Sequence, residues 1–447
     1  MHKVRKRQQK IDIEVTDEQI SGTAGLTFVA RMAERLGLRE GLASALHIKQ
    51  RDRGCSDAEM LLGLVYSLAS GNGVLRDLEA FRQDSPTLTL SGMDRAPGSR
   101  RLGEYLAKFS TADVASLLAV TRGVTAALLP EVCAREIQDR GYIPVFIDGS
   151  AIEVSGRYYE EARKGYNGVT QYWLHGIFVG GVWASGRLCP GGGDVAADWH
   201  AQLETDVRPV LAALASERAD SNEATHGPVL PVWVSTDNAY YRKAYVEYLR
   251  AQGWDYSISV TSGTYKRPIL REARAQIPED WTAINANEDA TIVTHRPDGW
   301  SQRQSYLVIR SEWEGTQRLA FPRYTVICVS RTDLPIKELV RRHRHKQGME
   351  NEFKGPLDAL DLHHPPCLRF FANQAFYACG QLAHLLLRAV QYHLLPPSAA
   401  RSSIRTLIHD VIRTVARVVK TGRRLRARFV KTTYRLDWIH YAACQLE

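Results

Sequence analysis

The spacing of apolar residues divides the chain into a helical beginning, a strand-rich middle and a helical end. Up to about residue 135, apolar side chains recur every three or four positions, as in GLTFVARMAERLGL, which is typical of amphipathic helices. Two capping patterns, Ser56 with Glu59 and Ser110 with Asp113, precede apolar runs and predict helix starts. We therefore expect a helical N-terminal region over residues 1–140, in which 1–12 form a flexible basic arm.

The pattern changes near residue 142. The run IPVFIDGSAIEV is rich in β-branched residues, and WLHGIFVGGVWASGRLC predicts two strands joined by a glycine turn. The sequence then predicts a helix over 198–217, a strand over 229–237, a helix over 240–252 and a strand over 255–261. Strands followed by alternating helices and strands indicate an α/β core with a mixed sheet, whose first part we place at 141–261.

The remaining third of the chain alternates between strand-like and helical patterns. Residues 262–333 carry three strand-like runs separated by turns such as PDG, and they predict a β-rich insertion. A long helix from about 335 to 354 and another over 373–395 follow, so we place the second part of the core at 334–395. A further helix is expected over 402–431, within a basic helical C-terminal region at 396–447.

Composition and charge narrow the class of partner. The formal net charge of +9 favours an anionic partner, most often nucleic acid, although a solvated basic surface would give the same number. No apolar run of about 18 residues is evident and none follows the basic first ten residues, so no membrane partner is expected. The 7 Cys are scattered without a C-x-x-C pair, which argues against disulfides and a Cys-based zinc site and favours the cytoplasm.

Two aspartates follow buried strands. Asp148 comes after IPVFI and Asp237 after VLPVWVST, so each is expected near the C-terminal end of a strand, before a turn. Ligands bind at such ends in open α/β sheets, and two acids on adjacent strands can bridge hard divalent cations. Either aspartate alone could equally be a residue that caps a turn or helix.

A third acid lies on the predicted long helix, in LVRRHRHKQGMENEFK. Helical spacing puts His343, Lys346 and Lys354 on one stripe with Glu350. An acid flanked by such groups suits a site where the acid binds metal and the cations contact DNA phosphates, though a solvated charged helix fits as well. With Asp148 and Asp237, Glu350 predicts a site for two Mg²⁺ ions, with Mn²⁺ as a plausible substitute.

Three segments resemble bacterial insertion-sequence transposases of the DDE class. They are FIDGSAIEV around Asp148, WVSTDNAYYRKAYVEYLRAQGWDYSISV around Asp237 and HKQGMENEFKGPLDAL around Glu350. The resemblance implies an RNase H-like core in which these three acids bind metal and are catalytic. It also implies cleavage at the terminal inverted repeats of a transposon and attack of the freed 3′-OH on target DNA. Enzymes of this kind work as homodimers or larger synaptic complexes.

The branch that the chain resembles carries a Tyr-Arg-Glu-Lys signature around its Glu. In this sequence His343 occupies the Tyr position and Lys346 the Arg position, and Lys346 lacks the bidentate fork of Arg. The Lys expected seven residues after Glu350 is Leu357, while Lys354 lies one turn nearer.

Further basic residues are candidates for DNA contact. The N-terminal helices could bind DNA in helix-turn-helix style, with Arg100 and Arg101 as contacts, although other helical bundles look alike. Residues 401–435 hold 11 Lys or Arg against one Asp; a solvated helix face or a dimer element is the alternative there. Its candidate phosphate contacts are Arg423, Arg424, Arg426 and Arg428. Trp300 could stack on an exposed base or be a core residue.

The sequence leaves rival functions open. A domesticated derivative could bind DNA without cutting it, and a two-metal nuclease on the same core could cut without joining. A transcription regulator that uses only the N-terminal helices is a third alternative. For the transposase, we expect a bacterial cytoplasmic, nucleoid-associated location.

Overall fold

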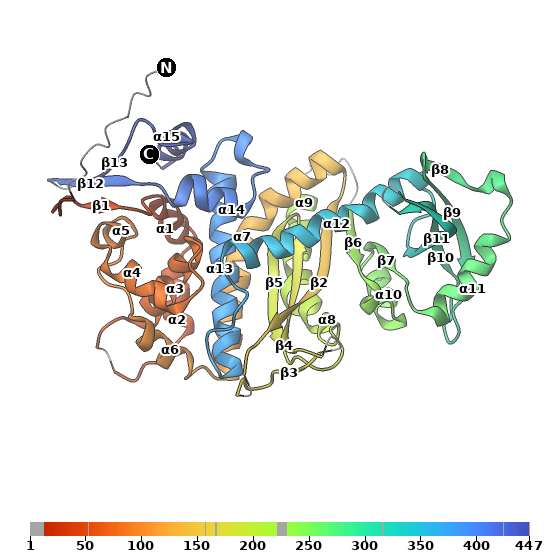
Figure 1. The fold of residues 1–447 in the computed structure, drawn as a ribbon, viewed down its shortest axis with the longest axis horizontal. Helices are drawn as coiled ribbons and strands as arrows, with labels where there is room; N and C mark the ends of the chain where they lie inside the picture. Colours follow the sequence, from red (N-terminus) through yellow and green to blue (C-terminus); the bar gives the residue numbers. More distant parts are fainter. Residues whose placement is uncertain are drawn as a thin grey trace, which may run out of the picture.

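A computed structural model describes residues 13–51, 53–156, 158–165, 168–220, 230–314, 317–422 and 424–446. The predicted basic arm at 1–12 and the candidate contact Arg423 lie outside these ranges. The molecule is elongated, with the N-terminal helices at one end, the central sheet in the middle and the insertion at the other end (Figure 1).

The N-terminal region is helical, as predicted. Its helices are α1 (Leu26–Arg35), α2 (Leu38–Ala45), α3 (Asp57–Ala69), α4 (Leu78–Gln83), α5 (Ser85–Leu90), α6 (Ser99–Leu106) and α7 (Thr111–Arg140). Both predicted capping boxes are present, at Ser56 and Ser110. Among the described residues, α7 is the helix long and apolar enough to cross a membrane by length and composition. In this fold α7 is a core helix, because it packs against α2 and α13 (Phe370–His393).

A mixed sheet forms the core. Its central strands are β2 (Ile143–Glu153), β4 (Thr170–Val179), β5 (Val182–Cys189), β6 (Val232–Thr236) and β7 (Asp255–Ser259). Strand β2 runs antiparallel to β4 and parallel to β6, β4 is antiparallel to β5, and β6 is parallel to β7. The order β5-β4-β2-β6-β7 confirms the expected α/β, RNase H-like core. The short strand β3 (Arg163–Lys164) extends its β4 edge.

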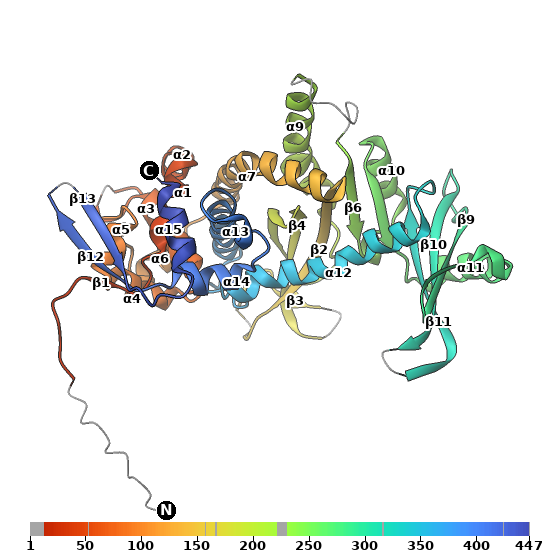
Figure 2. The ribbon, with the colours of Figure 1, turned by 90° about the horizontal axis from the view of Figure 1, so that it is seen from above.

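Helices cover both faces of the sheet. On one side are α8 (Trp199–Gln202), a π-helical turn (Leu203–Val207) and α9 (Arg208–Asp220), and α10 (Lys243–Ala251) connects β6 to β7. The long helix α12 (Ile336–Ala359) runs across the other face, from the insertion to α14 (Ile404–Leu407) (Figure 1 and Figure 2). Helix α13 is almost wholly buried between β5 and the N-terminal helices α1, α3 and α7.

The insertion continues the core sheet. Its strands β8 (Thr282–Asn285), β9 (Glu288–His295), β10 (Gln304–Glu314) and β11 (Gln317–Val329) are antiparallel, and β11 also pairs with β7. The predicted strands are therefore present, within one ten-stranded sheet. The helix α11 (Gly263–Arg274) was not predicted, although Ile269 and Ala273 are buried at helical spacing.

The expected helix over 402–431 is wrong. After α14 and a π-helical turn (Ile408–Ile412), the chain forms a hairpin of β12 (Ala416–Thr421) and β13 (Arg424–Phe429), followed by α15 (Leu436–Cys444). Gly422 has φ 59°, a left-handed conformation that suits a tight turn. Alternation of apolar and basic residues on either side of it has the period of a strand. Strand β12 pairs with β1 (Ile20–Ser21), so both ends of the described chain lie together.

Candidate active site

The two aspartates lie side by side in the middle of the sheet. The parallel ladder between β2 and β6 ends at the pair Ile147↔Thr236, and Asp148 and Asp237 are the next residues on the two strands. Neighbouring strands lie about 4.8 Å apart, so the two backbones are adjacent at this level. Both side chains are half-buried.

Asp148 is not at the end of its strand, which corrects the sequence-based expectation. Strand β2 continues to Glu153 because β4 stays paired with it throughout, whereas β6 stops at Thr236. Asp148 therefore lies where β2 loses its partner on one side. Asp237 does precede a turn, as predicted.

Each aspartate is oriented by a backbone amide. Asp237 Oδ1 accepts a hydrogen bond from the Ala239 amide at 2.9 Å, and Asp148 Oδ1 accepts one from the Gly149 amide at 2.8 Å. Asp237 thus caps a short turn, which is the purely structural role that a lone aspartate at this position could have. Its position beside Asp148 is what that alternative does not explain.

The face of the sheet that carries both aspartates is the face that α12 crosses. Phe146 lies two residues before Asp148, hence on the same face, and its ring packs against His345 of α12 at 5.5 Å between centroids. Gly176 is the cross-strand partner of Asp148, and a Cβ there would overlap the Phe353 ring of α12. Both contacts place α12 over the face of β2 and β4 that carries Phe146, Asp148 and Gly176.

The crossing brings the middle of α12 over the aspartates. His343 Nε2 lies 3.3 Å from Ser259 Oγ on β7, and Phe353 lies over β4. Ten helical residues span about 15 Å, and the three strand spacings from β7 to β4 span about 14 Å. The segment from Lys346 to Glu350 therefore passes over β6 and β2.

Glu350 can be placed only through its backbone, because its side chain lies outside the described part of the structure. Its Cα is seven residues from both His343 and Leu357, which puts each of them within about 20° of Glu350 around the helix. Leu357 is buried and His343 contacts β7, so this stripe of α12 faces the protein.

The donor set fits hard divalent cations. Two carboxylates meet side by side, and carboxylate oxygens are the ligands that Mg²⁺ and Mn²⁺ prefer. Among the side chains that the structure describes, no group of three His, Cys, Asp or Glu is arranged to hold a metal. Asp148 and Asp237 thus form a described pair that needs a third ligand, and the backbone of Glu350 passes above it.

The histidines of α12 supply no positive charge at neutral pH. Burial, followed by repulsion from Lys346 and Arg344, lowers the pKa of His343 to about 3. Burial also lowers the pKa of His345 to about 4. Of the candidate phosphate contacts on this part of the helix, Lys346 is half-buried and Lys354 is exposed.

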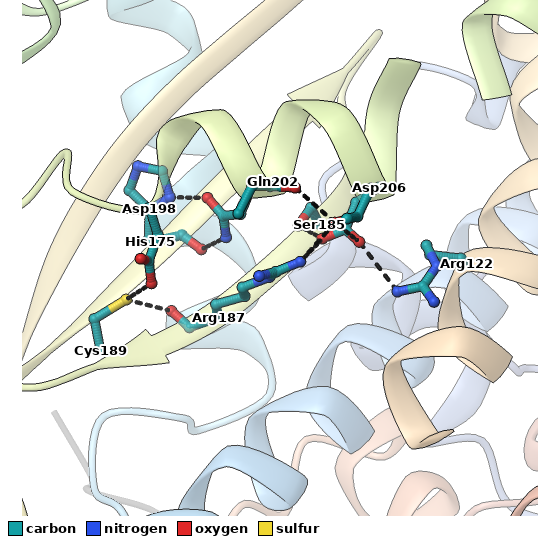
Figure 3. Close-up of polar contacts among 10 residues, drawn as sticks. Arg122, His175, Ser185, Arg187, Cys189, Asp198, Gln202 and Asp206 are labelled. Atoms are coloured by element: carbon teal, nitrogen blue, oxygen red, sulfur yellow. Dashed lines mark hydrogen bonds and ion pairs between the residues drawn. The ribbon is translucent and has the colours of Figure 1, made fainter. Parts of the chain in front are cut away.

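A polar cluster that includes His175 and Gln202 lies on the opposite face (Figure 3). It supports the turn after Asp237 through Tyr240. The buried ring of His175, cross-strand partner of Gly149, donates through Nδ1 to Gln202 Oε1 and accepts through Nε2 from the Tyr240 hydroxyl. Tyr240 is buried three residues after Asp237. Burial lowers the pKa of His175 to about 4, so the neutral ring has these two fixed roles.

Neighbouring ion pairs hold the same region. Asp206, buried in the π-helical turn, accepts from Ser185 at 2.6 Å and pairs with Arg187 and Arg122, both at 3.1 Å. Figure 3 shows these side chains joining β5, α7 and the π-helical turn. Neither this cluster nor His175 is predictable from the sequence, since no local pattern pairs residues so far apart.

Because burial lowers the pKa of His175, we expect the free energy of unfolding to fall in acid. Because its folded pKa is depressed, the unfolded chain binds the extra proton first, so stability is full above about pH 6.5 and falls as pH drops towards 4. One such group costs about 3 kcal/mol over that window. Urea unfolding at pH 7 and pH 4.5 should show a larger loss for the natural protein than for His175→Gln, which stays neutral. Equal losses in both proteins would contradict this role.

The other candidate contacts are dispersed. Arg100 and Arg101 are exposed on α6 and both pair with Glu104, at 2.9 and 3.1 Å. On β13, Arg424, Arg426 and Arg428 are exposed at alternate positions. They therefore line one face of the hairpin, an alignment that a helix would not have given.

Trp300 lies at the edge of the hydrophobic core, against which it packs. It is half-buried and stacks on the Tyr241 ring, with 5.4 Å between centroids and 21° between planes. Tyr241 in turn bonds the Tyr306 hydroxyl at 2.6 Å. Trp300 is thus held by β10 and by the turn that follows Asp237.

The strand order and the adjacent acids under a crossing helix place the chain in the class of RNase H-like enzymes. The chain also matches the model of a family described as "Transposase DDE domain group 1" over residues 3–447. It therefore belongs to this family of transposases, whose members act on transposon DNA and generally use divalent metal ions. No curated protein matches the chain in sequence.

Proposed function

We propose that the protein cuts DNA at the terminal inverted repeats of its transposon and joins the freed 3′-OH to target DNA. The observation that carries this proposal is the position of Asp148 and Asp237, side by side on β2 and β6 beneath α12. Glu350 completes the set of acids, and together they would hold two Mg²⁺ ions, for which Mn²⁺ can substitute.

The bound ions would activate a water or a 3′ hydroxyl and stabilise the leaving oxygen of the phosphodiester. The protein's own groups prepare the site. The Ala239 amide fixes the Asp237 carboxylate, and the buried Tyr240 and His175 hold the turn that supplies this amide. Lys346 brings a positive charge over the same row, where it can contact a phosphate.

DNA contacts extend beyond the acids in this proposal. Lys346 and Lys354, with the neutral His343 as a hydrogen-bonding neighbour, contact the strand being cut. Arg424, Arg426 and Arg428 offer an aligned row of charges for a second stretch of backbone, as Arg100 and Arg101 do on α6. Two transposon ends must be held together, so we propose a homodimer or larger synaptic complex, working in the nucleoid-containing cytoplasm.

The function is tested with the natural flanks of the reading frame. Full-length protein is incubated with linear DNA that ends in the flanking inverted repeats, supercoiled target DNA and Mg²⁺. We expect cut ends and joined products, neither of which forms in EDTA. Cut ends alone would indicate a nuclease without strand transfer, and binding without cutting would indicate a domesticated derivative.

A further inference from the structure

A cavity of about 630 Å³ lies beside α12, and neither aspartate is among its lining residues. It is enclosed by the end of α7, α12, the end of α13 and the loop 400–404. The Gly180 amide at its edge bonds Pro144 at the start of β2, about 13 Å along the strand from Asp148. Arg341, on its wall, is nine residues from Glu350, which is half a turn around the helix.

The lining is strongly basic. Five guanidinium groups face it, from Arg135, Arg140, Arg341, Arg388 and Arg401. The lining carboxylates are Glu136 and Asp139, and Arg341 is paired at 2.7 Å with Glu338 beside the lining, so five positive charges minus three negative charges leaves a surplus of two. Glu136 is already engaged by Arg140 at 2.6 Å. The cavity therefore attracts anions.

Arg388 is a buried cation without a counter-charge. It is 9% exposed, and no ion pair joins it to any residue that the structure describes. Its Nη1 donates to Gln391 Oε1 at 2.6 Å, while its Nε is buried with no hydrogen-bond partner. A buried guanidinium in this condition destabilises the fold unless an anion is supplied from outside.

The guanidinium is also held in a fixed orientation. Gln391 Nε2 donates to the carbonyls of Ala399 and Ser402, at 2.7 and 2.9 Å, which turns its Oε1 towards Arg388. The loop that closes the cavity thereby sets the direction of the Arg388 fork. A planar fork of this kind matches the oxygens of a phosphate.

We propose that this cavity binds backbone phosphates of DNA. The only aromatic ring among its described lining residues is Tyr392, and Arg135 covers one face of that ring at 4.2 Å from its centroid. The lining thus offers charge for phosphates but little platform for a base, which favours a nucleic-acid backbone over a free nucleotide. The identity of the anion as DNA rests on the proposed function.

The test compares Arg388→Met with Arg401→Met, at the exposed rim, and with Arg296→Met, an exposed arginine of the insertion, as control. Melting temperatures are measured in EDTA with and without inorganic pyrophosphate, and affinity for a 30-base-pair duplex is measured over a series of KCl concentrations. We expect pyrophosphate to stabilise the natural protein and the control, but not Arg388→Met. The slope of log affinity against log salt should fall by about 0.9 in each cavity variant.

Several outcomes decide the matter. Without ligand, Arg388→Met should melt at the natural temperature or above it, because an uncompensated charge is gone. A lower melting temperature with an unchanged salt slope in both cavity variants would make Arg388 a structural residue and overturn the proposal. A pyrophosphate effect without any change in the DNA slope would overturn DNA as the ligand. Cleavage and strand transfer by the natural protein are measured alongside in Mg²⁺, so failure of the catalytic proposal is seen separately.

Discussion

Replacement of Asp237 by Asn is expected to reduce both DNA cleavage and strand transfer by more than about a thousandfold, equivalent to about 4 kcal/mol of transition-state stabilisation. The amide keeps the size of the side chain and can still accept the hydrogen bond from Ala239, so the turn remains formed. What disappears is one negative charge beside Asp148, and with it a ligand for the metal ions. The measurement is the rate of cleavage under single-turnover conditions with saturating Mg²⁺.

A matched control is Asp298→Asn, which changes the same groups at an exposed turn of the insertion. This variant should cut at the natural rate. Duplex binding in EDTA should be alike in all three proteins, which excludes unfolding as the cause of the loss. Cleavage by Asp237→Asn at more than a tenth of the natural rate would remove Asp237 from the catalytic site.

Replacement of Gly176 by Ala is expected to impair the site, because the added methyl group lies between the sheet and α12. The new Cβ would overlap the Phe353 ring, which is packed against Phe178 and Trp183 and has little room to move. Overpacking of this kind costs about 1–3 kcal/mol, and it pushes α12 away from the row of aspartates. Gly176→Ala should therefore lower the free energy of unfolding by that amount and the rate of cleavage by at least about tenfold.

A double-mutant cycle identifies the mechanism of that loss. Phe353→Leu removes ring atoms from the contact, so Gly176→Ala should be less costly in the Phe353→Leu background than in the natural protein. Recovery of stability and of cleavage together would tie activity to the seating of α12. Additive effects of the two substitutions would show that the methyl group acts elsewhere.

The sequence predicted the strands of the candidate site but not their register. Asp148 and Asp237 were recognisable because each follows an apolar run, and their strands were predicted correctly. Which residues stand side by side depends on hydrogen bonds between segments nearly ninety residues apart, and no local pattern records them. For the same reason the His175, Gln202 and Tyr240 cluster could not be read from the chain.

The largest error, the C-terminal helix, had a visible local signal. The run ARVVKTGRRLRARF alternates at period two around Gly422, but the apolar stretch before it, SSIRTLIHDVI, has helical spacing and was extended too far. The missed helix α11 shows the converse problem. Its apolar stripe is short, and Pro268 and the many charges around it are not typical of a helix interior.

The pairing of β1 with β12 has a consequence for how the protein is made. The Ala24 amide donates to the Thr414 carbonyl and the Val418 amide donates to the Gln19 carbonyl. The segment before the N-terminal helices is therefore paired with a strand that follows nearly 400 residues later in the chain. During synthesis the N-terminal helices emerge long before that strand. They also emerge before α13, which covers part of their surface in the folded protein. A chain released before β12 has been made therefore leaves the paired edge of β1 without its partner.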